Sequence, residues 1–192
     1  MTPWPFGDLG MFRYGAILAD PPWYFRNYSA AGEAKNPVAQ YDCMDTAAIA
    51  ALPVNQLAAP DCALFMWATA PMMPDALALM KAWGFTFKSM GAWAKQSSNG
   101  AKSAFGTGYC FRSEAEFYLL GTIGKPRVMS RSVRNLIVAP TREHSRKPVH
   151  LHRNVESLYA GPYGELFGRE PRVGWDVWGN QSEKFLTDPV NR

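Results

Sequence analysis

Short apolar runs alternate along this chain with stretches in which apolar residues recur at helical spacing. Seven runs rich in branched and aromatic residues predict buried strands, at residues 14–19, 62–67, 85–94, 116–120, 135–139, 164–167 and 175–178. Helical spacing predicts a short helix over 45–52, a second over 74–83 that ends at Gly84, and a third that begins at Pro148. Strands that alternate with helices indicate a three-layer α/β sheet.

The segments between these elements are polar or rich in glycine. Residues 26–40 and 96–108 predict loops, residues 121–126 predict a glycine-bearing turn, and residues 140–147 predict a basic loop. Internal repeats and a dividing linker are both absent from the sequence, so residues 1–192 are expected to form a single domain.

The tetrapeptide Asp20-Pro21-Pro22-Trp23 directly follows the first predicted strand. Ligands of open α/β sheets bind outside the carboxyl ends of the strands, which is where this tetrapeptide would lie. The Asp20 carboxylate can accept a hydrogen bond from an amine, and the Pro21 carbonyl faces a ligand without its own N–H donor beside it. Trp23 offers a flat face for stacking. These residue types favour a ligand that is an amino-bearing base, although Pro-Pro after a strand is also typical of a stiff turn.

A nucleotide-type cofactor needs a strand, a tight glycine turn and polar groups for the ribose. Only nineteen residues precede Asp20, so the part of the chain that holds such a cofactor is expected near the C-terminus. The candidate is Glu165-Leu166-Phe167-Gly168-Arg169, followed one strand later by Gly179-Asn180-Gln181. Gly168 allows close backbone approach, Arg169 can donate to hydroxyls, and the two amides can pair with a base edge.

The distribution of charge along the chain predicts a polyanionic partner. The chain of 192 residues has a net charge of +4. Between Lys125 and Arg153, however, there are eight basic residues and one acid, Glu143, which gives this stretch a net charge of +7. Such a stretch suits a nucleic acid, and the alternative is an ordinary solvated basic face.

Other classes of protein are not indicated. The three cysteines are far apart and odd in number, so a disulfide framework is not expected, and the three histidines lack partners that would complete a metal site. The N-terminal residues do not resemble a signal peptide, and no apolar run is long enough to span a bilayer. A cytoplasmic protein without metal is therefore expected.

In their order along the chain, these motifs resemble those of the N6-adenine methyltransferases related to the catalytic subunit of the eukaryotic messenger-RNA adenosine methyltransferase. The likeness runs from about Tyr14 to Gln181, and the chain looks like a compact prokaryotic or phage member. Besides Asp20-Pro21-Pro22-Trp23, it rests on Leu64-Phe65-Met66-Trp67, Trp83-Gly84-Phe85, Trp93-Ala94-Lys95, Thr107-Gly108-Tyr109, Glu116 to Gly121, Ser145-Arg146-Lys147-Pro148, Phe167-Gly168-Arg169, Gly174-Trp175 and Trp178-Gly179-Asn180-Gln181.

The resemblance implies S-adenosylmethionine as methyl donor, adenine N6 as acceptor, and a Rossmann-like methyltransferase fold with permuted motif order. It implies catalytic roles for Asp20, Pro21, Pro22 and Trp23. It also implies cofactor contacts from Asp20, Lys147, Phe167, Gly168, Arg169, Asn180 and Gln181, with Arg172 as a further candidate for the ribose. The substrate contacts expected are those of Trp23, Trp93, Glu116, Arg142 and Arg146. For Trp93 a place in the core is an equal alternative, and Glu116 could equally be an acid of the strand whose charge is satisfied within the protein.

Three questions stay open at this point. The substrate is expected to be DNA rather than RNA, because no separate RNA-binding domain is evident in the sequence. A non-catalytic nucleic-acid-binding partner of the same fold is the other alternative, although such proteins usually lose the acid or the aromatic residue that this chain keeps at Asp20 and Trp23. A homodimer would enlarge the small surface that one such domain offers to nucleic acid.

Overall fold

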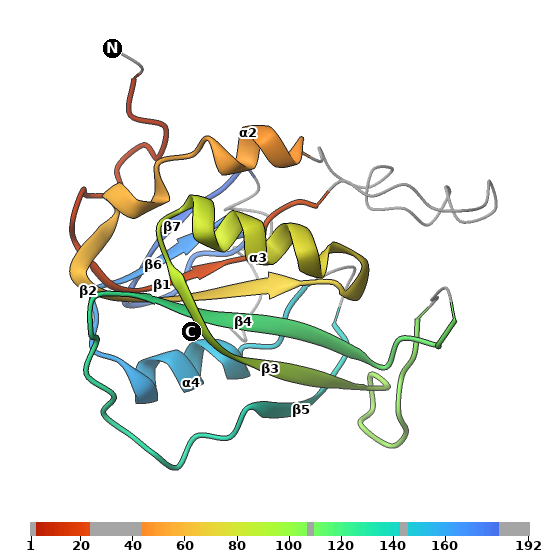
Figure 1. Ribbon diagram of the computed structural model, residues 1–192. Helices are drawn as coiled ribbons and strands as arrows, with labels where there is room; N and C mark the ends of the chain where they lie inside the picture. The colour runs from red at the N-terminus through yellow and green to blue at the C-terminus, as the bar shows by residue number, and fades with distance from the viewer. Residues whose placement is uncertain (1–2, 24–43, 107–109, 143–145, 181–192) are drawn as a thin grey trace.

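In the computed structural model, residues 3–23, 44–106, 110–142 and 146–180 are described. They form one seven-stranded sheet in the order β5-β3-β4-β2-β1-β6-β7 (Figure 1). The strands are β1 (Tyr14–Ala19), β2 (Ala58–Ala68), β3 (Thr86–Gln96), β4 (Ala115–Ile123), β5 (Leu136–Pro140), β6 (Tyr163–Leu166) and β7 (Trp175–Trp178). The helices are α2 (Thr46–Ala50), α3 (Met73–Ala82) and α4 (His150–Leu158), with short 3₁₀ turns at Val54–Gln56 and Ala70–Met72.

The apolar runs become central strands because both faces of the sheet are covered. Helices α2 and α3 lie on one face and α4 lies on the other, which gives the predicted three layers (Figure 1). In β1, Ile17 and Ala19 pack on the side of α2 and α3, whereas Ala16 and Leu18 pack on the side of α4. A strand buried on both faces has no polar alternation, so its sequence is a continuous apolar run.

Strand β4 is the only described strand whose direction is reversed. It pairs antiparallel with β2 and β3, and the other pairings in the sheet are parallel. The amino end of β4 therefore lies beside the carboxyl ends of its neighbours. We call the edge of the sheet where these ends meet the carboxyl edge, and the other edge the amino edge.

The predicted turn at residues 121–126 is wrong in its first half. Strand β4 continues to Ile123, and Gly121 pairs with Leu64 on one side and Phe87 on the other. Gly121 is a packing glycine, because a Cβ on it would lie 2.6 Å from the Met80 sulfur of α3. The turn comes at Gly124, whose φ of +62° is a conformation that glycine adopts readily.

Smaller differences concern element ends and coverage. Helix α4 begins at His150 rather than Pro148, a shift of the size expected at helix ends. The predicted loop at 26–40 lies outside the described residues. None of the described helices has the length and apolar composition needed to cross a membrane.

Candidate active site

Asp20 follows β1 at the point where the order of the sheet reverses. The chain goes from β1 to β2 on one side and later returns to β6 on the other, so the residues after β1 lie at a topological switch point, the usual ligand crevice of an open α/β sheet. The Asp20 N–H donates to the Leu166 carbonyl over 3.3 Å. The Asp20 motif and the predicted cofactor segment, 146 residues apart in sequence, are thereby adjacent at the carboxyl edge.

Four charged side chains meet at this edge, and we call them the tetrad: Asp20, Lys95, Glu116 and Lys147. The Lys147 ammonium lies 3.3 Å from Asp20 Oδ1 and 3.1 Å from Glu116 Oε2, and the Lys95 ammonium lies 2.7 Å from Glu116 Oε1. Each side chain is 17–21 % exposed, so the pairs are largely shielded from solvent. Reversal of β4 makes the tetrad possible, since it brings Glu116 at the start of β4 next to Lys95 at the end of β3.

The two carboxyl groups of the tetrad have opposite pKa shifts. Burial raises the pKa of Asp20 above its ordinary value, and the charges of Lys147 and Arg169 offset only part of that rise. Burial also acts to raise the pKa of Glu116, but Lys147 and Lys95 together outweigh it and lower that pKa to about 2. Glu116 is therefore a fixed anion that holds both lysines, whereas Asp20 is the carboxyl group of the pair that exchanges a proton more easily.

Replacing Glu116 by Gln is expected to lower the free energy of unfolding near pH 7 by roughly 3 kcal/mol, because the carboxyl pKa falls from about 4.5 to about 2 on folding. A lowered pKa in the folded state stabilises the protein above pH 4.5, and this stabilisation is lost as the pH falls toward 2. Urea unfolding near pH 7 and near pH 3 measures the effect, and the difference between the two proteins should shrink at the lower pH. Glu114→Gln is the matched control, since Glu114 is exposed. An equal loss at both pH values would show that Glu116 does not act through its charge.

The two prolines close a compact turn in front of Trp23. The Pro21 carbonyl accepts the Trp23 backbone N–H over 2.8 Å, and the Pro22 carbonyl accepts the N–H of Met44 over 3.2 Å. A carbonyl oxygen has two lone pairs, so Pro21 can accept a second hydrogen bond from a ligand. The Trp23 ring is 6 % exposed, and its Nε1–H donates to the Trp67 carbonyl over 3.2 Å. Trp23 thus anchors the turn in the core, and its stacking role stays a prediction.

Trp93 has the core position that the sequence left as its alternative. It is 3 % exposed, donates from Nε1 to the Ala139 carbonyl over 2.8 Å, and meets Trp67 edge to face. The Lys95 ammonium lies 5.6 Å from the Trp93 ring centre, and the Lys147 ammonium lies 5.6 Å from that of Trp67. The two rings therefore form the floor beneath the lysines of the tetrad. The expectation that Trp93 also forms a wall of the substrate pocket stays a prediction.

The predicted cofactor segment is a tight turn held by backbone contacts. Phe167 has a φ of +62°, which is rare for a residue with a side chain. Gly168 donates its N–H to the Trp178 carbonyl over 3.0 Å, and a Cβ on Gly179 would lie 2.5 Å from the Gly168 carbonyl oxygen. Asn180 follows and is exposed, whereas Gln181 lies outside the described residues.

Aromatic residues from the N-terminus support this turn, which the sequence analysis missed. Phe6 is fully buried and meets Trp178 edge to face at 5.1 Å between ring centres, Trp4 meets Phe6 at the same distance, and Phe167 meets Trp178 at 5.3 Å. The signal was present in the sequence as closely spaced aromatic residues ahead of the first strand, but nothing local indicates that they pack against the last one.

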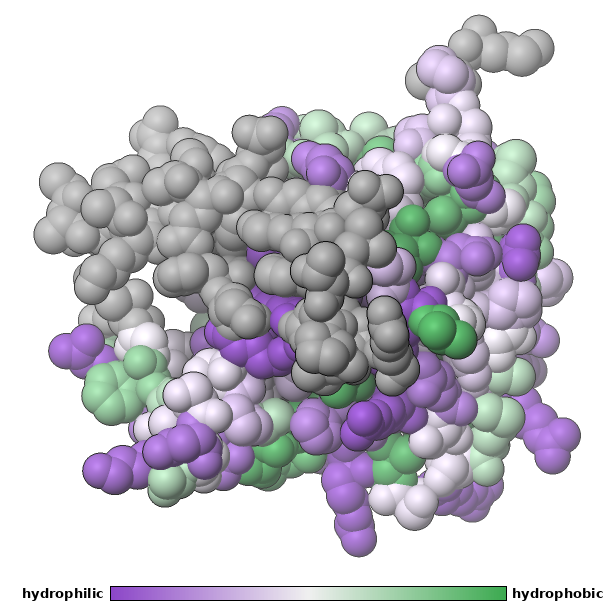
Figure 2. All heavy atoms as spheres, turned by 180° about the vertical axis from the view of Figure 1, so that it is seen from behind, coloured by the Kyte–Doolittle hydropathy of each residue, from purple (hydrophilic) through white to green (hydrophobic). Residues whose placement is uncertain are grey.

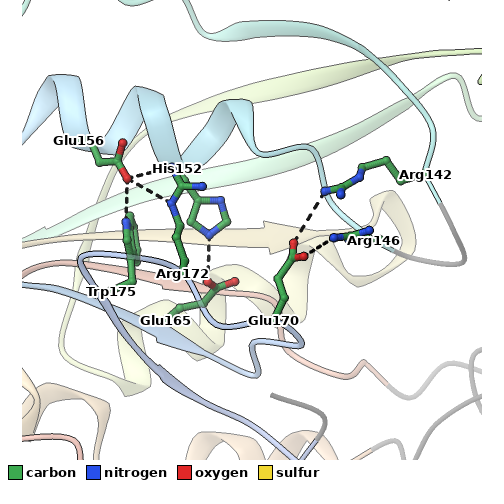
Figure 3. Close-up of polar contacts among 8 residues, drawn as sticks. All are labelled: Arg142, Arg146, His152, Glu156, Glu165, Glu170, Arg172 and Trp175. Atoms are coloured by element: carbon green, nitrogen blue, oxygen red, sulfur yellow. Dashed lines mark hydrogen bonds and ion pairs between the residues drawn. The ribbon is translucent and has the colours of Figure 1, made fainter. Parts of the chain in front are cut away.

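The basic residues between Lys125 and Arg153 do not lie together at one edge of the sheet, and their phosphate contacts stay a prediction. Strand β4 ends at the amino edge, so the loop that carries Lys125, Arg127, Arg131 and Arg134 lies at the amino edge, away from Asp20. At the carboxyl edge, Arg146 is buried and pairs with Glu170, whose other oxygen lies 3.7 Å from Arg142 (Figure 3). Glu170, which is at least 24 residues away in sequence, pairs with both Arg142 and Arg146. Phosphate contacts from these two arginines stay a prediction.

Helix α4 is joined to the last strands by a second set of polar contacts. Glu156 accepts hydrogen bonds from Arg172 at 3.0 Å and from the Trp175 indole at 2.8 Å, and His152 Nε2 lies 2.9 Å from Glu165 Oε2 (Figure 3). The Arg172 guanidinium therefore contacts α4. Its suggested contact with a ribose stays a prediction, and Glu156 is the partner that the structure shows for it.

The residues at the carboxyl edge fit S-adenosylmethionine. The Lys147 cation suits a carboxylate and Arg169 suits hydroxyls, while the exposed Asn180 amide suits a base edge. Gly168 and Gly179 bring two backbone segments into close contact. The fold and this site define an S-adenosylmethionine-dependent methyltransferase.

Residues 14–181 match the MT-A70 family, and the chain belongs to it. The resemblance drawn from the motifs is thereby confirmed, together with its fold class, and the protein is an adenine-N6 methyltransferase that uses S-adenosylmethionine.

Three relatives illustrate the range of similar proteins. The type II methyltransferase M.MunI of a Mycoplasma species is 29 % identical over 91 % of this chain and 80 % of its own length. A putative N6-adenosine-methyltransferase of Medicago truncatula is 30 % identical over 88 % of this chain but only 26 % of its own length. The human N6-adenine-specific methyltransferase METTL4 is 24 % identical over 90 % of this chain and 38 % of its own length.

Proposed function

We propose that the acceptor is adenine in DNA, and that the adenine leaves its base stack to reach Asp20. The observation that carries the catalytic part is the position of the Asp20 carboxylate, at the switch point of the sheet and next to the Phe167 turn. The DNA preference rests on the likeness to the type II methyltransferase, since most of both chains align. The adenosine methyltransferases share only about a quarter of their own length with this chain.

In this proposal Asp20 and Pro21 orient the amine. The amino group of adenine is a poor nucleophile because its lone pair is delocalised into the ring. The Asp20 carboxylate and the Pro21 carbonyl would each accept one N–H, which favours a tetrahedral nitrogen with its lone pair directed away from both oxygens. S-adenosylmethionine, when bound, supplies an electrophilic methyl carbon. Orientation of the amine and the placement of the Asp20 carboxylate beside it would then provide most of the rate.

The same residues provide a path for the proton released from the amine. Asp20 need not take it before the methyl group is transferred, because the methylated amine is far more acidic. A carboxyl group whose pKa is raised by burial accepts such a proton readily. Lys147, 3.3 Å away, would hold the carboxylate in place during this exchange.

Cofactor contacts are proposed for Asp20, Lys147, Phe167, Gly168, Arg169, Asn180 and Gln181. Lys147 would bind the methionine carboxylate, while Arg169 and the two amides would bind the adenosine part.

A cytoplasmic location is proposed as well, because Cys62 and Cys110 are free thiols and Cys110 is exposed, which suits a reducing compartment.

The test is incubation of the protein with radiolabelled S-adenosylmethionine and adenine-containing oligonucleotides, in single- and double-stranded DNA and RNA, followed by nucleoside analysis. Label in N6-methyladenine from DNA supports the proposal. Label from RNA alone would replace DNA by RNA as substrate. Absence of label together with absence of cofactor binding would favour the non-catalytic alternative, a partner that binds nucleic acid only.

A further inference from the structure

The segment between β3 and β4 leaves the sheet at the carboxyl edge and returns to it beside the tetrad. Figure 1 shows it projecting beyond the ends of the two strands. Its base is held on Lys95, whose carbonyl accepts the Ala104 N–H over 2.9 Å and whose N–H donates to Glu114 over 2.8 Å. We call the described residues 97–106 and 110–114 of this segment the arm.

The arm exposes two large aromatic side chains next to cations. Phe111 is 87 % exposed and Phe105 is 63 % exposed. Lys102 and Arg112, which flank these two residues, are also exposed. The Gly106 N–H donates to the Ser113 carbonyl over 2.9 Å, so the two sides of the arm are paired near both rings.

Exposed phenylalanines of this kind suggest a partner with flat apolar faces. Burying a phenylalanine side chain stabilises a protein by about 1.5–3 kcal/mol, and the fold leaves this stabilisation unused at Phe111 and Phe105. On the surface seen from behind, exposed hydrophobic residues of the described chain lie scattered among hydrophilic ones (Figure 2). In the arm, each exposed ring has a cation within three residues, and this combination binds bases and phosphates of an unstacked strand.

The arm also supplies exposed cations near the tetrad, which Lys125 to Arg134 and Arg146 do not. Lys125 to Arg134 lie at the amino edge, and Arg146 is buried against Glu170. Lys102 and Arg112 are exposed cations on a segment whose base hydrogen-bonds to a member of the tetrad. The arm therefore lies at the same edge of the sheet as Asp20, whereas the loop with Lys125 to Arg134 lies at the opposite edge.

We infer that the arm grips the nucleotides next to the target adenine, with Phe111 and Phe105 stacking on flanking bases and Lys102 and Arg112 contacting phosphates. This inference rests on the proposed function, because it takes a nucleic acid at Asp20 as given. Extruding a base costs stacking energy, and an aromatic side chain that stacks on the base next to the extruded one offsets part of that cost. The arm is thus a positioning element for the substrate that does not touch the reacting atoms.

The test compares Phe111→Ala with Phe111→Trp and with Val173→Ala in the full chain. Val173 is 88 % exposed and precedes β7, whose start lies at the amino edge, so it serves as the matched control.

The probe is an adenine-containing oligonucleotide with a fluorescent 2-aminopurine beside the target adenine. The emission of the 2-aminopurine reports stacking. Phe111→Ala is expected to weaken oligonucleotide binding by about 10-fold and to raise its KM similarly, since one stacked base contributes on the order of 1–3 kcal/mol. The affinity for S-adenosylmethionine should not change, Phe111→Trp should restore binding, and Val173→Ala should behave as wild type.

Two results would overturn the inference. The first is unchanged oligonucleotide binding and unchanged 2-aminopurine emission in Phe111→Ala, also when combined with Phe105→Ala. The second is a wild-type protein that dimerises through these rings, seen as a dimer in sedimentation that becomes a monomer in Phe111→Ala without any change in oligonucleotide binding. Failure of the proposed function would look different: wild-type protein would bind the oligonucleotide and transfer no methyl group to it.

Discussion

Asp20→Asn is expected to lower kcat by about 100- to 1000-fold, the effect of removing one preorganised electrostatic group from an active site. The asparagine side chain keeps the size of Asp20, but it loses the charge that accepts N–H donors and the ability to take up a proton. Because the Phe167 turn and Gly179 hold their geometry through backbone contacts, the affinity for S-adenosylmethionine should change little. Initial rates with labelled donor and a direct cofactor titration measure the two effects separately.

The control for this experiment is Asp45→Asn. Asp45 is exposed, precedes α2 and makes no side-chain cap hydrogen bond, so its substitution should leave both quantities unchanged. Normal turnover in Asp20→Asn would exclude the carboxylate as the group that orients the amine. A loss of cofactor affinity as large as the loss of turnover would instead make Asp20 mainly a cofactor ligand, which is the second role assigned to it.

Gly179→Ala is expected to weaken binding of S-adenosylmethionine by about tenfold or more, since small displacements of positioned groups are costly in an active site. The new Cβ would lie 2.5 Å from the Gly168 carbonyl oxygen and 3.0 Å from the Gly168 nitrogen, so the Phe167 turn must move. Crowding of this kind destabilises a folded protein by about 1–3 kcal/mol, which a lower Tm would report. Calorimetric titration well below the Tm measures the affinity of the folded protein.

Gly106→Ala provides the comparison for cofactor binding and Tm. The nearest atom to a Cβ on Gly106 is the Ser113 carbonyl oxygen at 3.9 Å, an ordinary contact, so neither quantity should change. If Gly179→Ala bound the cofactor as tightly as wild type, the turn between Phe167 and Gly179 would not form part of the cofactor site.

The position of the main site was predictable from the sequence because it depends on local features. A continuous apolar run indicates a strand buried on both faces, and the residues after it must lie at an edge of the sheet. Asp20 and the Phe167 turn were found in this way. Their adjacency required the pairing of β1 with β6, which the resemblance supplied as a permuted motif order.

The electrostatics of the site were not predictable, because they depend on strand direction. No local pattern in the residues of β4 indicates that it runs antiparallel, and this reversal brings Glu116 to Lys95 and Lys125 to the amino edge. Lys95 was noticed as part of a motif and was given no role. Arg146 belongs to a basic run in sequence and to a buried ion pair in space, since Glu170 comes from a different part of the chain.

The aromatic contacts between the N-terminus and the last strand have a practical consequence. A fragment trimmed to the limits of the family match would start at Tyr14 and would lack Trp4 and Phe6. The Trp178 ring, and through it the Phe167 backbone, would then lose the packing that now covers it. The family match is therefore narrower than the fragment needed to keep this packing, and Trp4 and Phe6 should be retained in any shortened version of the protein.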